Sequence, residues 1–308
     1  MAEPSKDKDL FKFVPYSAEK AEFTASSGYS YWGSVFHNFT RKKVTMVMAA
    51  IFVILFVSSM IIPLVGKYQV GSLVPDSDMA FQAPSAEHWF GTDNLGRDYW
   101  CQVWYASRVS ICLSLLVAVG ELVIGVIFGL IWGYVQKLDG FFTAIYNIVN
   151  NIPEIIYLTL VSLLVGQGFW IMAASLIAFG WLTMARNVRN MVLMYRNREF
   201  NLASRCLGTP VRRILSRNIL PQLVSVIILR LALSIPGTIG MESTLSFLGL
   251  GMDVNTPSLG ILLRNARVYF LEYPYLLIFP AIIVSLITVT FYLVGNAFSD
   301  ASDPKNHV

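Results

Sequence analysis

The sequence predicts an all-α, polytopic membrane protein with six transmembrane helices. Its composition, its long apolar runs and the placement of its basic residues all favour this class. Of the 308 residues, 55% are hydrophobic and only 14% are charged, whereas soluble domains carry about 25% charged residues. Length alone would allow about two soluble domains. Several apolar runs, however, reach the roughly 20 residues that a helix needs to span the hydrocarbon core.

The chain is expected to run as a tail, six spans and the loops that join them. The first 43 residues lack an apolar core, which excludes a signal peptide, and are expected to form a cytoplasmic tail. Residues 29–39 in this tail are rich in aromatic side chains and can form an amphipathic helix at the membrane surface. The spans are expected at residues 44–65, 109–135, 141–165, 169–185, 222–248 and 274–298.

Two of these spans carry further signals. Glycine and other small residues in the span 109–135 favour close packing against a neighbouring helix. Asn150, Asn151 and Pro153 form a polar break within the span 141–165. The break predicts a hinge, a lining of the transport pathway or simply the cytoplasmic start of that span.

The basic residues assign the loops to the two sides of the membrane, because cytoplasmic loops carry the excess of lysine and arginine. Arg41, Lys42 and Lys43 place the N-terminus inside, and the eight arginines of the loop 186–221, against the single Glu199, place that loop inside too. An even number of spans must separate two inside segments, so Gly166-Gln167-Gly168 is predicted to be a turn between two spans. Residues 66–108 and 249–273 then lie outside, and residues 299–308 form a second cytoplasmic tail.

A short basic helix-turn-helix at residues 199–221 lies within the cytoplasmic loop. Asn201 is expected to cap its first helix, and Gly208 to end that helix in a left-handed conformation. Thr209 and Pro210 are expected to supply the N-cap and the first residue of the second helix. The apolar face of the second helix is expected to consist of Val211, Ile214 and Leu215.

Three functions fit this segment. A basic loop that only sets membrane topology is common. A DNA-binding helix-turn-helix is a second alternative, which the membrane spans on both sides disfavour. The third is docking to a cytoplasmic protein, which the rigid, two-sided helix pair favours.

The segment resembles the cytoplasmic loop of permease subunits of ABC importers, whose motif is EAA, followed by Gly and then by Ile-Leu-Pro, here Ile219-Leu220-Pro221. Ala203, Gly208 and the terminal Leu220-Pro221 stand at the expected spacing, whereas Leu202 and Ser204 depart from the family's Glu and Ala. In that family this loop forms the coupling helix that fits a groove in the ATP-binding subunit. The resemblance implies that the ATPase-coupling residues are Leu202, Ala203, Ser204, Gly208, Thr209, Pro210, Leu220 and Pro221.

Two further motifs narrow the family. HWFGTDNLGRD at residues 88–98 and ESTLSFLGLGMDVNTPSLG at residues 242–260 resemble signatures of the oligopeptide, dipeptide and nickel branch, with PSLG in place of the more usual PSWG. The chain therefore resembles the C-type permease subunit of oligopeptide (Opp/Ami) and dipeptide (Dpp) importers, particularly their Gram-positive versions. The resemblance implies the type I ABC importer permease fold.

An ionisable side chain within a membrane span costs free energy, so each such residue is a candidate for a functional role. Arg230 would lie roughly 12 Å into the membrane at a rise of 1.5 Å per residue, and it is a candidate for the translocation path, with snorkelling as the alternative. The resemblance makes Glu242 a candidate for the path or a gate, and a structural role is its alternative. Glu121 is expected to contact a partner helix in the interior.

The outer segment 66–108 supplies candidates for contact with a substrate-delivering protein. Asp93 and Arg97 are expected to face that protein. Asp98 has a second interpretation that we favour, as the N-cap of a helix beginning at Tyr99, because aspartate is strongly preferred at that position.

Several classes of protein have no support in the sequence. It contains no GxxxxGK[ST] phosphate-binding loop, and neither its scattered histidines nor its cysteines have the spacing of metal ligands or of a disulfide framework. No arrangement typical of nucleophilic catalysis is present, so we expect no enzyme, no metal and no cofactor in this chain. The histidines are His37, His88 and His307, and the cysteines are Cys101, Cys112 and Cys206.

The resemblance implies a multi-pass subunit of the plasma membrane, with both termini cytoplasmic, that imports oligopeptides or dipeptides. Its implied partners are a homologous second permease, two ATP-binding cassette subunits that hold ATP and Mg²⁺, an extracellular peptide-binding lipoprotein and membrane lipid, but no nucleic acid. Two alternatives stay open. One is a nickel or metal-chelate permease of the same family, and the other is a membrane scaffold without transport activity.

Overall fold

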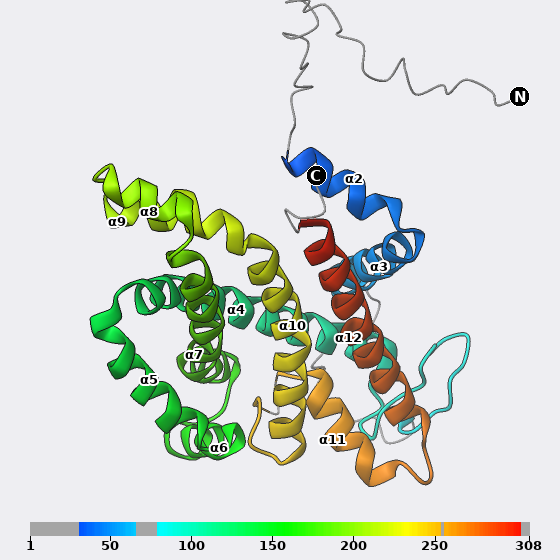
Figure 1. Ribbon diagram of the computed structural model, residues 1–308. Helices are drawn as coiled ribbons and strands as arrows, with labels where there is room; N and C mark the ends of the chain where they lie inside the picture. The colour runs from blue at the N-terminus through cyan, green and yellow to red at the C-terminus, as the bar shows by residue number, and fades with distance from the viewer. Residues whose placement is uncertain (1–30, 66–78, 254–255, 303–308) are drawn as a thin grey trace, which may run out of the picture.

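The computed structural model describes residues 31–65, 79–253 and 256–302, and its helices confirm the predicted all-α class (Figure 1). In chain order they are α2 (Tyr31–Arg41), α3 (Lys43–Val65), α4 (Tyr99–Tyr134), α5 (Gln136–Asn150), α6 (Glu154–Val165), α7 (Phe169–Arg196), α8 (Glu199–Cys206), α9 (Val211–Arg213), the π-helix η3 (Ile214–Ile219), α10 (Leu220–Phe247), α11 (Leu259–Tyr269) and α12 (Tyr275–Ser302). The N-terminal residues 1–30 and His307 lie outside the described residues.

Five of the described helical segments are long and apolar enough to cross a membrane, and the total rises to six when a bent pair of helices counts as one span. The five are α3, α4, α7, the run Val211–Phe247 that ends with α10, and α12. The bent pair is α5 and α6. This number agrees with the polytopic class that the apolar runs predict.

The segment 141–165, expected to be a single span, is instead two helices that meet at an angle of 79°. The break falls at the polar residues noted in the sequence, because α5 ends at Asn150 and α6 begins at Glu154. Pro153 precedes α6 with an extended ψ of 130°, and proline also disfavours helical conformation in the residue before it. The bend lies at the polar break, where the sequence predicts a hinge, and the two helices together can still count as one broken span or as a re-entrant loop.

Other boundaries differ from the expected ones because polar residues continue the helices beyond the apolar runs. α4 begins at Tyr99 instead of residue 109, and α7 continues past residue 185 to Arg196. The polar end of α7 is held by contacts with α5, in which Arg186 lies 4.3 Å from the Tyr146 ring and Arg189 pairs with Asp139 at 2.6 Å. The outer loop 249–273 also contains a helix of its own, α11.

The turn predicted at residues 166–168 is present between α6 and α7. Gly166 and Gly168 have φ of 114° and 141°, a region that residues with a Cβ rarely adopt. This turn is compatible with the even number of spans inferred from the arginines, provided that the bent pair α5–α6 counts as one span.

α4 and α7 pack closely along a row of glycines at every fourth position of α4, as the small residues of the second span predict. A Cβ atom added at Gly125 would lie 2.6 Å from Cβ of Met184, and one at Gly129 would lie 2.6 Å from the carbonyl oxygen of Ala185. Such distances leave no room for any side chain. Small residues at this spacing allow membrane helices to approach closely.

The second packing unit consists of α3, α10, α11 and α12 around the outer half of α4. Its buried core includes Val103, Ile111, Ile239, Leu259 and Ile287. α2 lies beside the C-terminal end of α12, where Phe39 meets Phe298 edge to face at 5.5 Å between ring centroids. In Figure 1, α2, the end of α12 and the pair α8–α9 lie toward one end of the molecule, and α11 lies toward the other.

Candidate functional site

The first candidate site is the coupling segment, which we define as residues 199–221. α8 begins after Arg198 and not at Asn201, which is the third residue of the helix. The prediction that Asn201 caps this helix is therefore wrong. Its side chain is fully buried, where Nδ2 donates to the Tyr195 carbonyl at 2.9 Å and Oδ1 accepts from Asn218 Nδ2 at 3.1 Å. Asn201 thus ties α8 to the end of α7 and to η3.

The turn after α8 has the geometry predicted at Gly208, whose φ is +73°. The Thr209 N–H donates to the Ser204 carbonyl at 3.0 Å, and the Gly208 N–H donates to the Arg205 carbonyl at 2.9 Å. These two bonds form a Schellman motif, which satisfies the last carbonyls of a helix. No atom lies within 4 Å of the position a Cβ would take, so backbone conformation alone favours glycine here.

The second helix of the coupling segment begins one residue later than expected. Pro210 is its N-cap, with an extended ψ of 146°, and Val211 is its first residue. Thr209 is therefore not the cap. The helix continues without a break through the π-helix η3 into α10, because Ile214 and Ile219 are buried against Val192 and its neighbours on α7.

Polar side chains fix the coupling segment to the membrane helices. Arg205 Nε donates to the Tyr134 hydroxyl at 3.1 Å and its Nη2 donates to the Arg196 carbonyl at 3.1 Å. Arg196 Nη1 in turn donates to the Gly133 carbonyl at 3.2 Å. The ends of α4 and α7 and the whole of α8 are therefore linked, so that displacement of α8 acts on two membrane spans.

The tip of the coupling segment leaves apolar and cationic side chains exposed together. Leu207, beside the Gly208 turn, is 85% exposed. Large apolar side chains that are exposed without lipid-facing neighbours typically mark a protein interface. The exposed apolar and cationic side chains of the coupling segment include Phe200, Leu202, Ala203, Arg205, Leu207, Val211, Arg212, Arg213 and Arg217.

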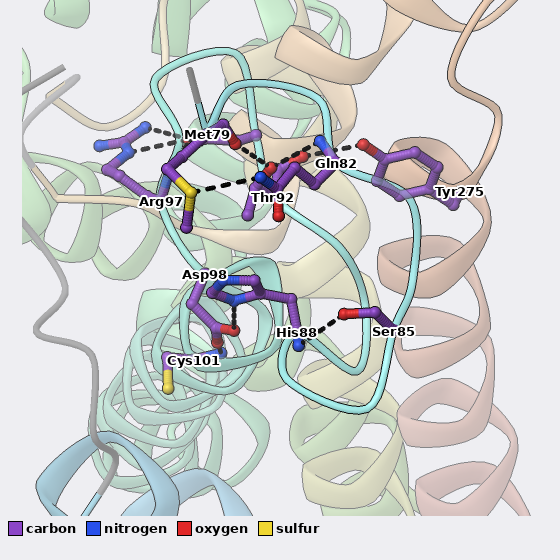
Figure 2. A network of polar contacts seen from close by, with 10 residues as sticks. Met79, Gln82, Ser85, His88, Thr92, Arg97, Asp98, Cys101 and Tyr275 are labelled. Carbon is purple, nitrogen blue, oxygen red and sulfur yellow. Dashed lines mark hydrogen bonds and ion pairs between the residues drawn. The ribbon is translucent and has the colours of Figure 1, made fainter. Parts of the chain in front are cut away.

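The second candidate site is the outer loop that precedes α4, where Asp93 was expected to face a partner (Figure 2). Asp93 is buried, and its Oδ1 accepts from the N–H groups of Leu95 and Arg97, both at 2.9 Å. Its Oδ2 accepts from Arg97 Nη2 at 2.6 Å and from Gln102 Nε2 at 2.9 Å. All these contacts lie within the chain, so Asp93 and Arg97 hold the shape of the loop and Asp93 does not offer a free carboxylate.

The same loop confirms the interpretation of Asp98 as an N-cap. Its Oδ1 accepts from the Cys101 N–H at 2.8 Å at the start of α4, and its Oδ2 lies 2.8 Å from His88 Nδ1 (Figure 2). The loop is also attached to the last span, because the Tyr275 hydroxyl donates to the Thr92 carbonyl at 2.9 Å. His88 is the first residue of the motif 88–98, but a buried partner 10 positions away leaves no local pattern that would predict this contact.

Glu242, a candidate for the path or gate, is buried with a relative exposure of 0%. Its carboxylate accepts from the hydroxyls of Ser246 at 2.7 Å and Ser258 at 2.5 Å, and Ser110 lies at 3.5 Å. These serines come from α10, from the N-cap of α11 and from α4. Glu242 therefore joins three elements inside this chain, and it does not line the membrane cavity described next.

The third candidate site is a cavity of about 320 Å³ between α4, α6, α7 and α10. Arg230 lines it, together with two carboxylates from other helices, Glu121 and Glu154. Glu121 accepts a hydrogen bond from the Ser234 hydroxyl at 2.6 Å, which is the contact with a partner helix that the sequence predicts. Glu154 also lines an adjoining cavity of about 180 Å³.

Comparison with known proteins gives a consistent family. The model of the binding-protein-dependent transport system inner membrane component family matches residues 125–308. The chain is 38% identical over 303 residues to the oligopeptide transport system permease protein AmiD of Streptococcus pneumoniae, covering 98% of both chains. It is 35% identical over 268 residues to the dipeptide transport system permease protein DppC of Bacillus subtilis, covering 86% of this chain and 83% of that protein.

A third relative and a solved structure extend the comparison. The oligopeptide transport system permease protein OppC of Bacillus subtilis is 32% identical over 299 residues, covering 97% of both chains. A chain of the methionine ABC transporter MetNI in an inward-facing conformation matches with a TM-score of 0.52 and 20% identity, over 64% of this chain and 96% of that chain. At that identity the structural match supports the fold alone.

Proposed function

Because the chain belongs to the binding-protein-dependent transport system inner membrane component family, we propose that it is the permease subunit of an ABC importer for oligopeptides or dipeptides. The single observation that carries the substrate class is its similarity, over 98% of both chains, to an oligopeptide permease. The chain itself is not an enzyme in this proposal, since ATP and Mg²⁺ are held by partner subunits. It spans the plasma membrane six times with both termini in the cytoplasm.

The coupling segment docks on an ATP-binding subunit. Its exposed tip offers apolar side chains such as Phe200, Leu202 and Leu207 beside exposed arginines. This combination suits a groove with an apolar floor and an acidic rim. The Gly208 turn holds α8 and the following helix in a fixed relation, so the two halves of the tip present one surface.

Movement of the ATP-binding subunits reaches the membrane through the contacts behind this tip. The hydrogen bonds of Asn201 with Tyr195 and Asn218, and of Arg205 with Tyr134, join α8 to α7, η3 and α4. Closure of the ATP-bound subunits therefore biases the spans toward one of two access states. A bound nucleotide shifts such an equilibrium only by its difference in affinity for the two states.

The outer loop receives the extracellular peptide-binding lipoprotein, and a homologous second permease completes the translocation path. Within the loop, Asp93 and Arg97 act as supports through their ion pair, while neighbouring side chains such as the exposed Trp89 and Asn94 make the contact. Arg230 lies on the path and Glu242 fixes the outer end of the helices beside it.

Uptake by intact cells tests the substrate class. Cells with and without this chain are supplied with labelled dipeptides, tetra- to hexapeptides and nickel chelates, with a strain that lacks other peptide importers as host. Loss of peptide uptake alone supports the proposal, and the length profile separates dipeptides from oligopeptides. Loss of nickel uptake alone would show that the substrate is a nickel chelate and not a peptide. Unchanged uptake of all three would favour the scaffold alternative.

A further inference from the structure

We propose that the cavity between α4, α6, α7 and α10 is a binding site within the membrane that recognises the two charged ends of a peptide. Arg230 binds the terminal carboxylate and Glu154 binds the terminal ammonium group. This inference rests on the proposed function, because it names how that function's substrate is held during its passage. No side chain of the peptide is read by either contact.

The size of the cavity suits a short peptide. Its volume is about 320 Å³, and the adjoining cavity of about 180 Å³ shares Glu154 and Thr183 with it. Binding sites for small molecules typically occupy about 300–1,000 Å³. A whole peptide of two or three residues, with both of its termini, therefore fits without rearrangement of the helices.

The charges at the cavity are not satisfied within the chain. Among the described residues, neither Arg230 nor Glu154 makes a hydrogen bond or an ion pair. Glu121, in contrast, accepts a hydrogen bond from Ser234 at 2.6 Å. A charge held within a membrane span is costly unless it pairs with another charge, lies against water or serves transport. Both side chains are exposed in this chain, so their charges face open space at the cavity and not a protein partner among the described residues.

The two charges have opposite signs and come from different helices, Glu154 from the start of α6 and Arg230 from the middle of α10. They share a cavity and yet form no pair, so the space between them is left for a ligand that carries both a cation and an anion. A peptide is such a ligand whatever its sequence. Uncharged polar side chains between them, Thr183 and Asn187, offer hydrogen bonds to the peptide backbone.

Two ionic contacts and a few hydrogen bonds also suit passage through a membrane. A transport pathway must bind its substrate strongly enough to admit it and weakly enough to release it. Contacts confined to the termini give every peptide short enough for the cavity a similar and modest affinity. The alternative is that Arg230 pairs with a carboxylate of the second permease and not with the peptide. The experiment below distinguishes these two partners.

The test measures equilibrium binding of tritiated tri-alanine to the full complex in nanodiscs, without nucleotide and without the binding protein. The C-terminal amide and the N-acetyl form of tri-alanine serve as competitors. The variants are Arg230→Gln, Arg230→Lys and Glu154→Gln, with Arg267→Gln as the control because Arg267 is an exposed residue of α11 outside the cavity. Size-exclusion chromatography reports whether each complex stays assembled.

We expect Arg230→Gln to weaken binding of tri-alanine by about tenfold, the loss of one hydrogen-bonded charge contact, and to leave binding of the amide unchanged. Arg230→Lys should keep part of the affinity. Glu154→Gln should weaken tri-alanine and leave the N-acetyl form unchanged, and Arg267→Gln should have no effect. Such a cycle isolates each pair of groups, since a general distortion would weaken all three ligands.

Equal weakening of all three ligands, or no saturable binding to the wild-type complex, would overturn the proposal. Dissociation of the Arg230→Gln complex would also overturn it, because Arg230 would then belong to a contact between subunits. ATP-driven peptide uptake by the same wild-type complex, measured in parallel with the binding protein, reports on the proposed function separately. Uptake without binding in the cavity would remove this inference and leave the importer.

Discussion

Gly208 shows how one residue determines the shape of the coupling segment. Its φ of +73° allows two hydrogen bonds that close α8, from the N–H groups of Gly208 and Thr209 to the carbonyls of Arg205 and Ser204. The Leu202 and Ser204 positions depart from the family's usual residues, and this turn depends on neither of those side chains. The backbone geometry that presents Leu207 is therefore kept although the motif is incomplete.

Replacement of Gly208 by valine should uncouple ATP hydrolysis from transport. A β-branched residue in the left-handed region costs about 1–3 kcal/mol, so the turn should open and misplace Leu207. We expect ATP hydrolysis to continue and peptide uptake per ATP to fall at least severalfold in proteoliposomes. Gly140→Val in α5 is the matched control, since Gly140 has open space around it and is not among the positive-φ glycines. Wild-type uptake per ATP by Gly208→Val would show that the turn is dispensable.

At the scale of single residues, substitutions of Glu242 distinguish a structural role of its carboxylate from a gating role. Removal of its carboxylate would leave buried hydroxyls of Ser246 and Ser258 without their acceptor, and an unsatisfied buried group costs about 1–3 kcal/mol. Glu242→Ala should therefore lower the thermal unfolding midpoint of the purified complex clearly. Glu242→Gln, which keeps an acceptor oxygen, should lower it less and retain uptake.

The control for this pair is Thr244→Ala, because Thr244 is exposed and bonds only the Gly240 carbonyl at 2.8 Å among the described residues. A normal unfolding midpoint together with abolished uptake in Glu242→Gln would contradict the structural role. That combination would support a gating role for Glu242.

At the scale of elements, the sequence predicts the helices better than their ends. Apolar runs and the rule for basic loops gave the class and the reversal at residues 166–168. The helix starts and ends depended on contacts that no local pattern records. α4 extends back to Tyr99 because Asp98, itself held by His88, caps it there, and α7 extends to Arg196 because α5 supplies Asp139 and Tyr146 as partners for its arginines.

The candidate site was predictable to a similar degree. Gly208 and Asp98 act through their own backbone neighbours, so their roles follow from local sequence. Asn201, Asp93 and Glu242 are fixed by partners that the fold brings close. The cap expected at Asn201 is wrong, and for Glu242 the sequence left a gating and a structural role open. The place of Glu154 beside Arg230 could not be predicted, because it depends on α6 and α10 lining the same cavity.

The glycine row between α4 and α7 offers a test of packing between elements. Gly129→Leu would place a side chain where Cβ alone already lies 2.6 Å from the Ala185 carbonyl oxygen and 2.7 Å from Val188 Cβ. Overpacking typically costs about 1–3 kcal/mol, and more is expected where backbone is the obstacle. The variant should show a lower unfolding midpoint and a lower yield of assembled complex. Gly140→Leu, with open space around it, is the control, and equal behaviour of the two variants would contradict the close contact.

For the whole molecule, the proposed topology puts α8 in the cytoplasm and the loop before α4 outside. Cys206 is exposed at the end of α8, whereas Cys101 is buried and Cys112 is half-buried in α4. After replacement of Cys101 and Cys112 by serine, a membrane-impermeant maleimide should label Cys206 in permeabilised cells and not in intact cells. Asn94→Cys, added to a chain that lacks the native cysteines, should be labelled in intact cells. Labelling of Cys206 in intact cells would invert the topology.

The whole assembly is needed for the central claim, which is that this chain couples ATP hydrolysis at its coupling segment to peptide import. The most direct measurement is peptide accumulation in proteoliposomes that contain the complete complex, with the binding protein on the outside and ATP inside. The account predicts accumulation that requires ATP and falls when the exposed Leu207 and Val211 are both replaced by aspartate, while the complex still inserts in the membrane. Undiminished ATP-driven accumulation by that double variant, or no accumulation by the wild-type complex, would contradict it.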